Sequence, residues 1–172
     1  RLLERRISAD PVGTGRVRIP DRATVAETQP AGGWSFRVSE PPSVERPADV
    51  LVDFGRAIPM DGVLLINNTS TRFTVEALQS GKSPEEASDA DWLKAADYKA
   101  PEDKKYGCLT ASRHDRTEFL AFQDTVVTRA LRVRVAAGYR GGKVGLKRTA
   151  DDPCLIETEL LMPLRLLDAR PK

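Results

Sequence analysis

The chain has 172 residues, of which 40% are hydrophobic and 30% charged, as is typical of a soluble globular domain large enough to bury a core. Its 27 Lys and Arg against 25 Asp and Glu leave a formal charge of only +2, without the basic stripe that nucleic-acid binding favours. No apolar run approaches the roughly 20 residues that a membrane-spanning helix needs. These features argue against a nucleic-acid partner and against a membrane span.

The start of the sequence and its two cysteines leave the cellular compartment of the protein open. The sequence starts without Met and without a signal-peptide pattern, which indicates a mature protein or a fragment of a longer chain. Cys108 and Cys154 lack the spacing of a zinc site and have only His114 beside them. One disulfide and two separate buried thiols both fit this pair.

The first 49 residues are rich in Pro, Gly and charge, and we assign them to strands and loops of the same domain as the rest. Residues 16–20 alternate polar and apolar before a proline, which predicts a short edge strand. A turn over residues 29–33 leads into a predicted strand over residues 34–38. Trp34 alternates there with other apolar residues, which favours a place in the core over a place in a ligand site.

From Val50 onward, short apolar segments alternate with turn residues. Residues 50–55 and 63–66 predict two strands, with Pro59 breaking the chain between them. Residues 72–78 alternate cleanly and predict a third. Short strands at this spacing are typical of a sandwich or barrel.

One helix is predicted among the strands. Ser83 is a suitable cap, Pro84 suits the first helical position, and Glu86 lies three residues after the cap. The segment has few apolar residues to bury, so we expect a short surface helix over residues 83–90, outside the sandwich. Trp92, just beyond it, is assigned to the core.

Strand patterns resume at residues 118–122 and 130–135. In the second segment, Leu and Val alternate with Arg132 and Arg134, which predicts one buried face and one solvated face. Acidic residues on a neighbouring strand are the expected partners of these arginines.

A last apolar segment, residues 154–167, is broken by Pro163. The total is about eight strands and one minor helix, so the fold class is all-β. The residues expected to be largely buried are Phe54, Leu64, Ile66, Phe73, Val75, Leu131, Val133 and Val135.

Several ordered segments carry a family resemblance. They are residues 50–55 (strand, Asp, hydrophobic, Gly), 60–66, 73–80 with Trp92, 129–135 and 155–160. From Val50 to about Asp168 the chain resembles the discoidin family, also called coagulation factor type C or galactose-binding-like domains. The resemblance implies an antiparallel β-sandwich of the jelly-roll type, with residues 50–172 as its core and the short helix as an insertion.

The resemblance also implies binding without catalysis. His114 lies in a polar run with no nucleophile elbow, so we expect no enzyme. The first hypothesis is a carbohydrate-binding module of a larger extracellular or periplasmic protein. The alternative is a structural or protein-interaction domain of a larger assembly without a sugar site, which the 6% share of aromatic residues favours.

The candidate ligand site consists of polar residues and one aromatic residue next to strand ends: Asn67, Asn68, Arg113, His114, Tyr139 and Arg140. A sandwich gathers its loops at two ends, and the ring of Tyr139, among glycines, offers a face for a sugar.

We expect no cofactor, and the resemblance suggests a structural Ca²⁺ beside the binding loops as the one candidate. Its candidate ligands are Asp151, Asp152 and Glu157. A turn that carries solvated acids is the favoured explanation of these residues, and the calcium site is the alternative.

Overall fold

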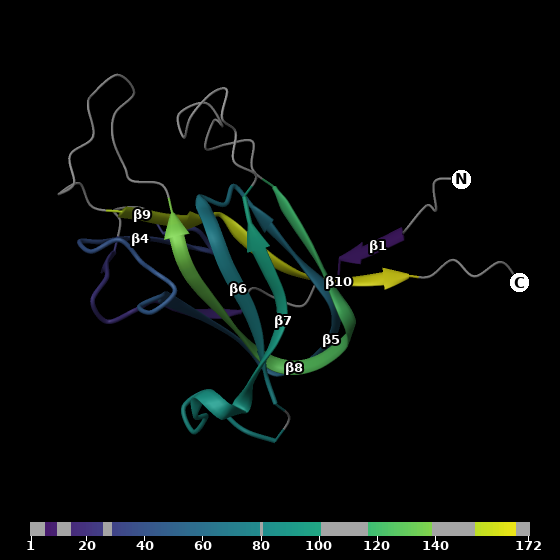
Figure 1. Cartoon of the computed structure of the whole chain (residues 1–172). Helices are drawn as coiled ribbons and strands as arrows, with labels where there is room; N and C mark the ends of the chain where they lie inside the picture. Colours follow the sequence, from purple (N-terminus) through teal and green to yellow (C-terminus); the bar gives the residue numbers. More distant parts are fainter. Residues whose placement is uncertain are drawn as a thin grey trace, which may run out of the picture.

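The described residues of the computed structural model form two antiparallel β-sheets packed face to face (Figure 1). The structure describes residues 6–9, 15–25, 29–79, 81–100, 117–138 and 154–167. Its elements are β1 (Arg6–Ala9), β2 (Arg16–Arg18), β3 (Thr24–Val25), β4 (Trp34–Val38), β5 (Ala48–Ile66), β6 (Ser70–Leu78), the 3₁₀ helix η1 (Asp89–Asp91), β7 (Trp92–Lys99), β8 (Glu118–Gly138), β9 (Cys154–Thr158) and β10 (Leu160–Leu167). The all-β sandwich prediction is confirmed.

The larger sheet has the strand order β1-β10-β5-β8-β6-β7, and β2 also pairs with β5. The smaller sheet has the order β3-β4-β9. The N-terminal strands therefore pair with strands from later in the chain. Within the described residues, no helix has the length and hydropathy of a membrane-spanning segment.

Two predicted breaks in the strands are wrong. β5 continues through Pro59, and β8 joins residues 118–122 to 130–135 in one strand. The β5–β8 pairing has register shifts between Asp53 and Ile58 and between Met60 and Gly62, so Pro59 lies in an irregular stretch. Such a stretch tolerates the missing N–H of proline.

The break predicted at Pro163 in the last apolar segment lies elsewhere in the structure. Pro163 lies inside β10, and the chain bends instead at Glu159, between β9 and β10. β1 pairs only with residues 164–167 of β10, so in the described part of the chain no strand pairs with the outer side of β10 at Pro163. A proline is tolerated at such an edge position.

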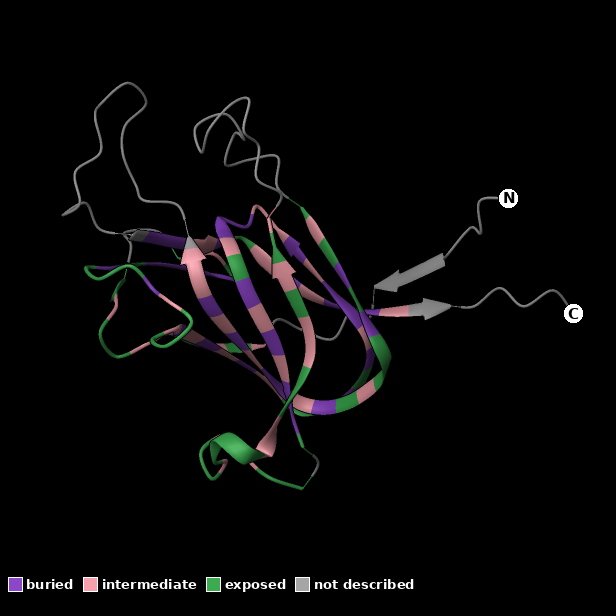
Figure 2. Cartoon of the chain, in the orientation of Figure 1, coloured by how far each residue is buried: buried purple, intermediate pink, exposed green. Residues whose placement is uncertain are grey.

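The core lies between the two sheets, and buried residues alternate with intermediate or exposed ones along much of β6 and β8 (Figure 2). Five of the predicted core residues are confirmed: Phe73, Val75, Leu131, Val133 and Val135. Trp34 is 1% exposed, so its predicted place in the core is confirmed too.

Four core predictions are wrong. Leu64 and Ile66 are half-buried on the outer face of the sheet, while Val63 and Leu65 face the core. An uninterrupted apolar run carries no alternation from which to tell the two faces apart. Phe54 only packs against the edge of the core, where β5 leaves its register with β8.

Trp92 is the fourth of these residues, because it too is half-buried. The Arg132 guanidinium lies 5.0 Å from the centroid of its ring. An arginine in this position over an aromatic face makes a cation–π contact. Trp92 therefore belongs to the charged outer face of the sheet.

The outer face carries the expected ion pairs. Arg132 donates to Glu76 on β6 at 2.6 Å and to Asp89 of η1 at 2.7 Å. Arg134 donates to Asp49 on β5 at 3.0 Å. Glu76 and Asp49 confirm the prediction of acidic partners on neighbouring strands, and Arg132 also attaches the η1 segment to the sheet through Asp89.

The helix predicted over residues 83–90 is wrong in extent. The segment forms a turn closed by the Glu86 N–H on Ser83 O at 3.1 Å, followed by the single turn of η1. The Asp91 carboxylate accepts the Ser88 N–H at 2.8 Å and so caps η1. With few apolar residues to bury, so short a segment does not recover the cost of nucleating an α-helix. Its place at the surface is as predicted.

The segment Asp53–Gly55 turns the chain where β5 leaves β8. The Asp53 carboxylate accepts the Gly55 N–H at 2.8 Å, and Gly55 has φ +75°, which glycine adopts readily. Arg129 donates two hydrogen bonds of 3.0 Å to the same carboxylate. Chiefly through these bonds, Arg129 holds the pKa of Asp53 below its ordinary value of 3.8.

We expect the Asp53–Arg129 pair to make part of the stability depend on pH. Because the folded pKa of Asp53 is lowered, its carboxylate stabilises the fold above the ordinary value, and this contribution is lost as the pH falls through the folded value. Urea unfolding of the wild type and Asp53→Asn from pH 7 to pH 2 should therefore show a stability difference that shrinks below about pH 4. Glu40→Gln, which removes an exposed ion pair with Arg46, is the control. A difference that stays constant with pH would rule out the role given to Asp53.

Candidate functional site

Several strand ends meet at one end of the sandwich. The turn between β5 and β6 contains Asn67, and Ser70 at the start of β6 pairs with Gly138 at the end of β8. Ala100, just after β7, donates its N–H to Thr71 O at 2.7 Å. The arrowheads of β7 and β8 accordingly lie at the same end in Figure 1, opposite η1.

Asn67 and Glu159 form a polar pair at this end. Asn67 has φ 52°, a left-handed conformation that asparagine tolerates better than most residues. Its side-chain amide donates to the carboxylate of Glu159, which is exposed at the bend between β9 and β10. The Glu159 N–H is in turn held by Ile66 O at 2.9 Å.

Sequence reasoning missed Glu159. Its position depends on the bend that separates β9 from β10, whereas the sequence predicts the break at Pro163. No local signal marks this bend, because it lies where the backbone of Gly33 passes close to Thr158 and Glu159.

Asn68, predicted to contact ligand, is 1% exposed and faces inward. Its side chain donates to Ser70 O at 3.0 Å and accepts the Ser70 N–H at 3.1 Å. The Thr158 hydroxyl donates to the same Asn68 oxygen at 3.1 Å. The side-chain amide of Asn68 therefore holds the turn together. Of the two asparagines, only Asn67 reaches the surface.

Most of the other predicted site residues lie outside the described residues. They are Arg113, His114, Tyr139, Arg140, Asp151 and Asp152, together with Cys108 of the cysteine pair. Their roles stay predictions. The flanking residues that the structure does describe, Ala100 and Gly138, lie at the end that carries Asn67.

Glu157, the third predicted calcium ligand, lies on β9 and is half-buried. Its carboxylate accepts the Ser35 hydroxyl at 2.8 Å. Among the described residues, no three metal-ligating side chains lie together. The calcium site also stays a prediction, because its two aspartates are not described.

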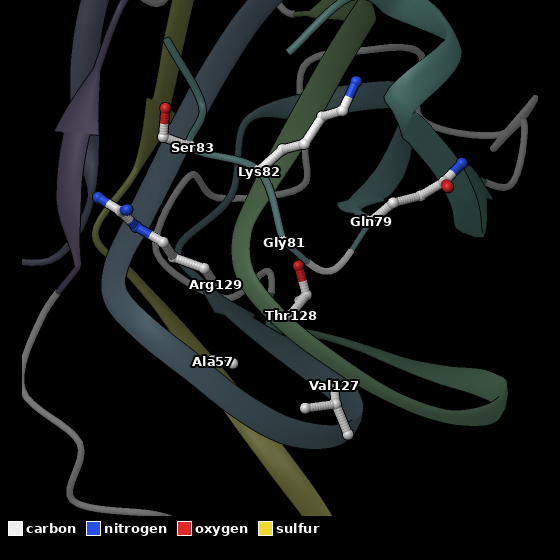
Figure 3. A pocket seen from close by; sticks show the side chains of 8 residues that line it. All are labelled: Ala57, Gln79, Gly81, Lys82, Ser83, Val127, Thr128 and Arg129. Atoms are coloured by element: carbon white, nitrogen blue, oxygen red, sulfur yellow. The ribbon is translucent and has the colours of Figure 1, made fainter. Parts of the chain in front are cut away.

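A shallow cleft of about 310 Å³ lies at the opposite end of the sandwich, between the insertion and the bend of β5 and β8 (Figure 3). Lys82 and Arg129 line it, but their charged groups point in different directions. Lys82 is paired with Asp91 at 2.8 Å and Arg129 with Asp53. None of the predicted site residues lines this cleft, and its cations do not converge on a common point.

The fold has the architecture of the galactose-binding-like β-sandwiches, and solved structures of that class are similar to it along nearly the whole chain. One is the family 32 carbohydrate-binding module from Clostridium perfringens NanJ in complex with galactose, with a TM-score of 0.56 and 12% identity, covering 92% of this chain and 99% of that one. A second is CpGH89CBM32-5 from the same organism in complex with GalNAc-β-1,3-galactose, with a TM-score of 0.55, 12% identity and coverages of 90% and 98%.

A third is a point mutant of chitosan-binding module 1 of a chitosanase/glucanase from Paenibacillus sp. IK-5, with a TM-score of 0.54, 10% identity and coverages of 91% and 98%. No protein-family model matches the chain. No curated protein matches it either. Similarity at these identities shows the fold alone, so the antiparallel β-sandwich that the sequence resemblance implies is confirmed.

Proposed function

We propose that this chain is a non-catalytic carbohydrate-binding module of the discoidin type, belonging to a larger extracellular or periplasmic protein. One observation supports it above the others: a galactose-binding-like sandwich presents the Asn67–Glu159 pair at the end where β7 and β8 stop. The segments that follow these two strands contain Arg113, His114, Tyr139 and Arg140. We propose these residues as the remainder of the site.

The chemistry of the pair suits sugar hydroxyls. A carboxylate offers about four acceptor positions, so Glu159 can accept from a hydroxyl while it holds the amide of Asn67. A sugar site also needs an aromatic face against the apolar side of the ring, and Tyr139 is the candidate. We retain Asp151, Asp152 and Glu157 as proposed ligands of a structural Ca²⁺ in the same domain.

The choice of test ligands follows from the similar structures. Two of those modules were solved with galactose or with a galactose-containing disaccharide, and a third binds chitosan. Galactose-containing glycans are therefore the first ligands to test on this chain, and chitosan oligosaccharides the second.

We expect the isolated domain to bind galactose-containing glycans on an array, and Tyr139→Ala and Glu159→Ala each to weaken that binding about tenfold, the effect of truncating a central contact. Titration calorimetry gives the affinities, and circular dichroism checks that the variants are folded. Lys82→Ala, in the cleft at the opposite end, is the matched control and should bind like the wild type. Loss of binding in the control, with unchanged binding in the other two, would place the site elsewhere.

The alternative is a protein-interaction domain, and one observation favours it. Met162, Leu64 and Phe119 form an apolar row across β10, β5 and β8 on the outer face, and Phe119 is 41% exposed. Exposed apolar surface of this kind marks interaction sites when it is extensive. If the wild type binds no glycan on the array, this alternative takes first place.

A further inference from the structure

The end of the sandwich that carries Asn67 is unusually polar inside. The described part of the chain has six buried polar residues, and four of them lie in the Asn67 turn or directly beside it: Asn68, Thr69, Ser70 and Thr158. Each is at most 1% exposed. A buried polar group costs stability unless it is hydrogen-bonded, and apolar side chains would fill the same space without that cost.

The hydrogen bonds of Thr69 and Thr158 fix the turn to β9, and the bonds between Asn68 and Ser70 close the turn itself. Thr69 donates its N–H to Glu157 O at 2.9 Å, and its hydroxyl accepts the Glu157 N–H at 2.9 Å. The Asn68 side chain bridges Ser70 and the Thr158 hydroxyl. The backbone on both sides of Asn67 is thereby fixed relative to Glu159, its partner at the surface.

We propose that Asn68 and Thr158 are positioning residues, which hold Asn67 and Glu159 in a fixed mutual orientation for a sugar hydroxyl. This inference rests on the proposed function. A site whose polar groups are already oriented loses less conformational freedom when ligand binds, and precise orientation requires hydrogen-bonded support beneath the contacting residues. Thr158 acts only through Asn68, since it is completely buried.

The chain supplies a matched control for Thr158. Thr128 is the one buried hydroxyl residue of the described chain at the opposite end of the sandwich, 1% exposed, and it donates to Leu78 O at 2.8 Å. Thr158→Val and Thr128→Val make the same chemical change in equally buried places. Thr158→Ser keeps the hydroxyl and serves as the rescue variant.

The first measurement is the affinity for galactose by calorimetry. We expect Thr158→Val to bind about five- to tenfold more weakly than the wild type, corresponding to one buried hydrogen bond, while Thr158→Ser and Thr128→Val bind like the wild type. Equal losses in Thr158→Val and Thr128→Val would indicate general destabilisation and overturn the proposal. Unchanged binding in Thr158→Val would overturn it as well.

The second measurement needs no ligand and therefore separates this inference from the proposed function. Amide hydrogen exchange at Ser70 and Glu159 should accelerate in Thr158→Val and stay unchanged in Thr128→Val, since the amide of Ser70 bonds to Asn68 and that of Glu159 to Ile66. If the wild type binds no galactose, accelerated exchange still supports the positioning role and the proposed ligand class fails. If exchange does not change, the positioning role is wrong.

Discussion

Replacing Gly33 with Ala should destabilise the domain by about 3 kcal/mol, the upper range for overpacking a well-packed site. A Cβ atom at this position would lie 2.0 Å from Thr158 O and 2.4 Å from Glu159 O. Both are backbone atoms in a segment that pairs with β4 and is fixed to the Asn67 turn, so neither can move without breaking hydrogen bonds. Urea unfolding at neutral pH measures the effect.

Gly81→Ala is the control for this substitution. Gly81 has φ +87° and nothing within 4 Å of an added Cβ, so its replacement costs only the left-handed backbone conformation, about 1–2 kcal/mol. Because the Gly33 effect is steric, it should be the larger of the two. Equal losses in the two variants would show that the contact between β4 and the bend at Glu159 is looser than described.

Trp34→Ala should remove about 3–5 kcal/mol, the usual cost of truncating a fully buried aromatic residue. Trp34 is 1% exposed and belongs to the core cluster between the sheets. Its indole Nε1 has no hydrogen-bond partner among the described residues. The side chain therefore contributes through packing, and thermal or urea unfolding measures the loss.

Trp34→Phe separates packing from hydrogen bonding at the same position. It leaves a smaller cavity than Ala and removes an unpaired buried donor, so its stability should lie within about 1 kcal/mol of the wild type. A Phe variant as unstable as the Ala variant would contradict this account, because a single lost hydrogen bond is too weak to produce that loss.

The sequence predicted most of the fold wherever apolar and polar residues alternate. Phe73 and Val75, and the arginines between Leu131 and Val135, identify their strands and buried faces correctly because alternation reflects one-sided burial directly. The run Val63–Ile66 is apolar throughout, and only its pairing with β8 and β10 decides which residues face the core. Such pairing involves partners distant in sequence and leaves no local signal.

The candidate site was predictable only in part, because local residues indicate a turn but do not indicate which distant residues it contacts. Two asparagines after an apolar run predict a turn, and the structure has that turn. Sequence alone did not show that Asn68 points inward, because that depends on Thr158 lying beside it. Glu159 was missed because its bend depends on contact with Gly33.

The strand order also has a consequence for biosynthesis. β8 lies between β5 and β6 in the larger sheet. β5 and β6 are consecutive in the chain but do not pair with each other. As the chain leaves the ribosome, β5, β6 and β7 all emerge before β8. Until then the edges of β5 and β6 that will pair with β8 are unpaired. Unpaired strand edges can form hydrogen bonds with strands of other chains and so cause aggregation. β5 and β6 can join one sheet only when β8 arrives, and aggregation during synthesis competes with that step.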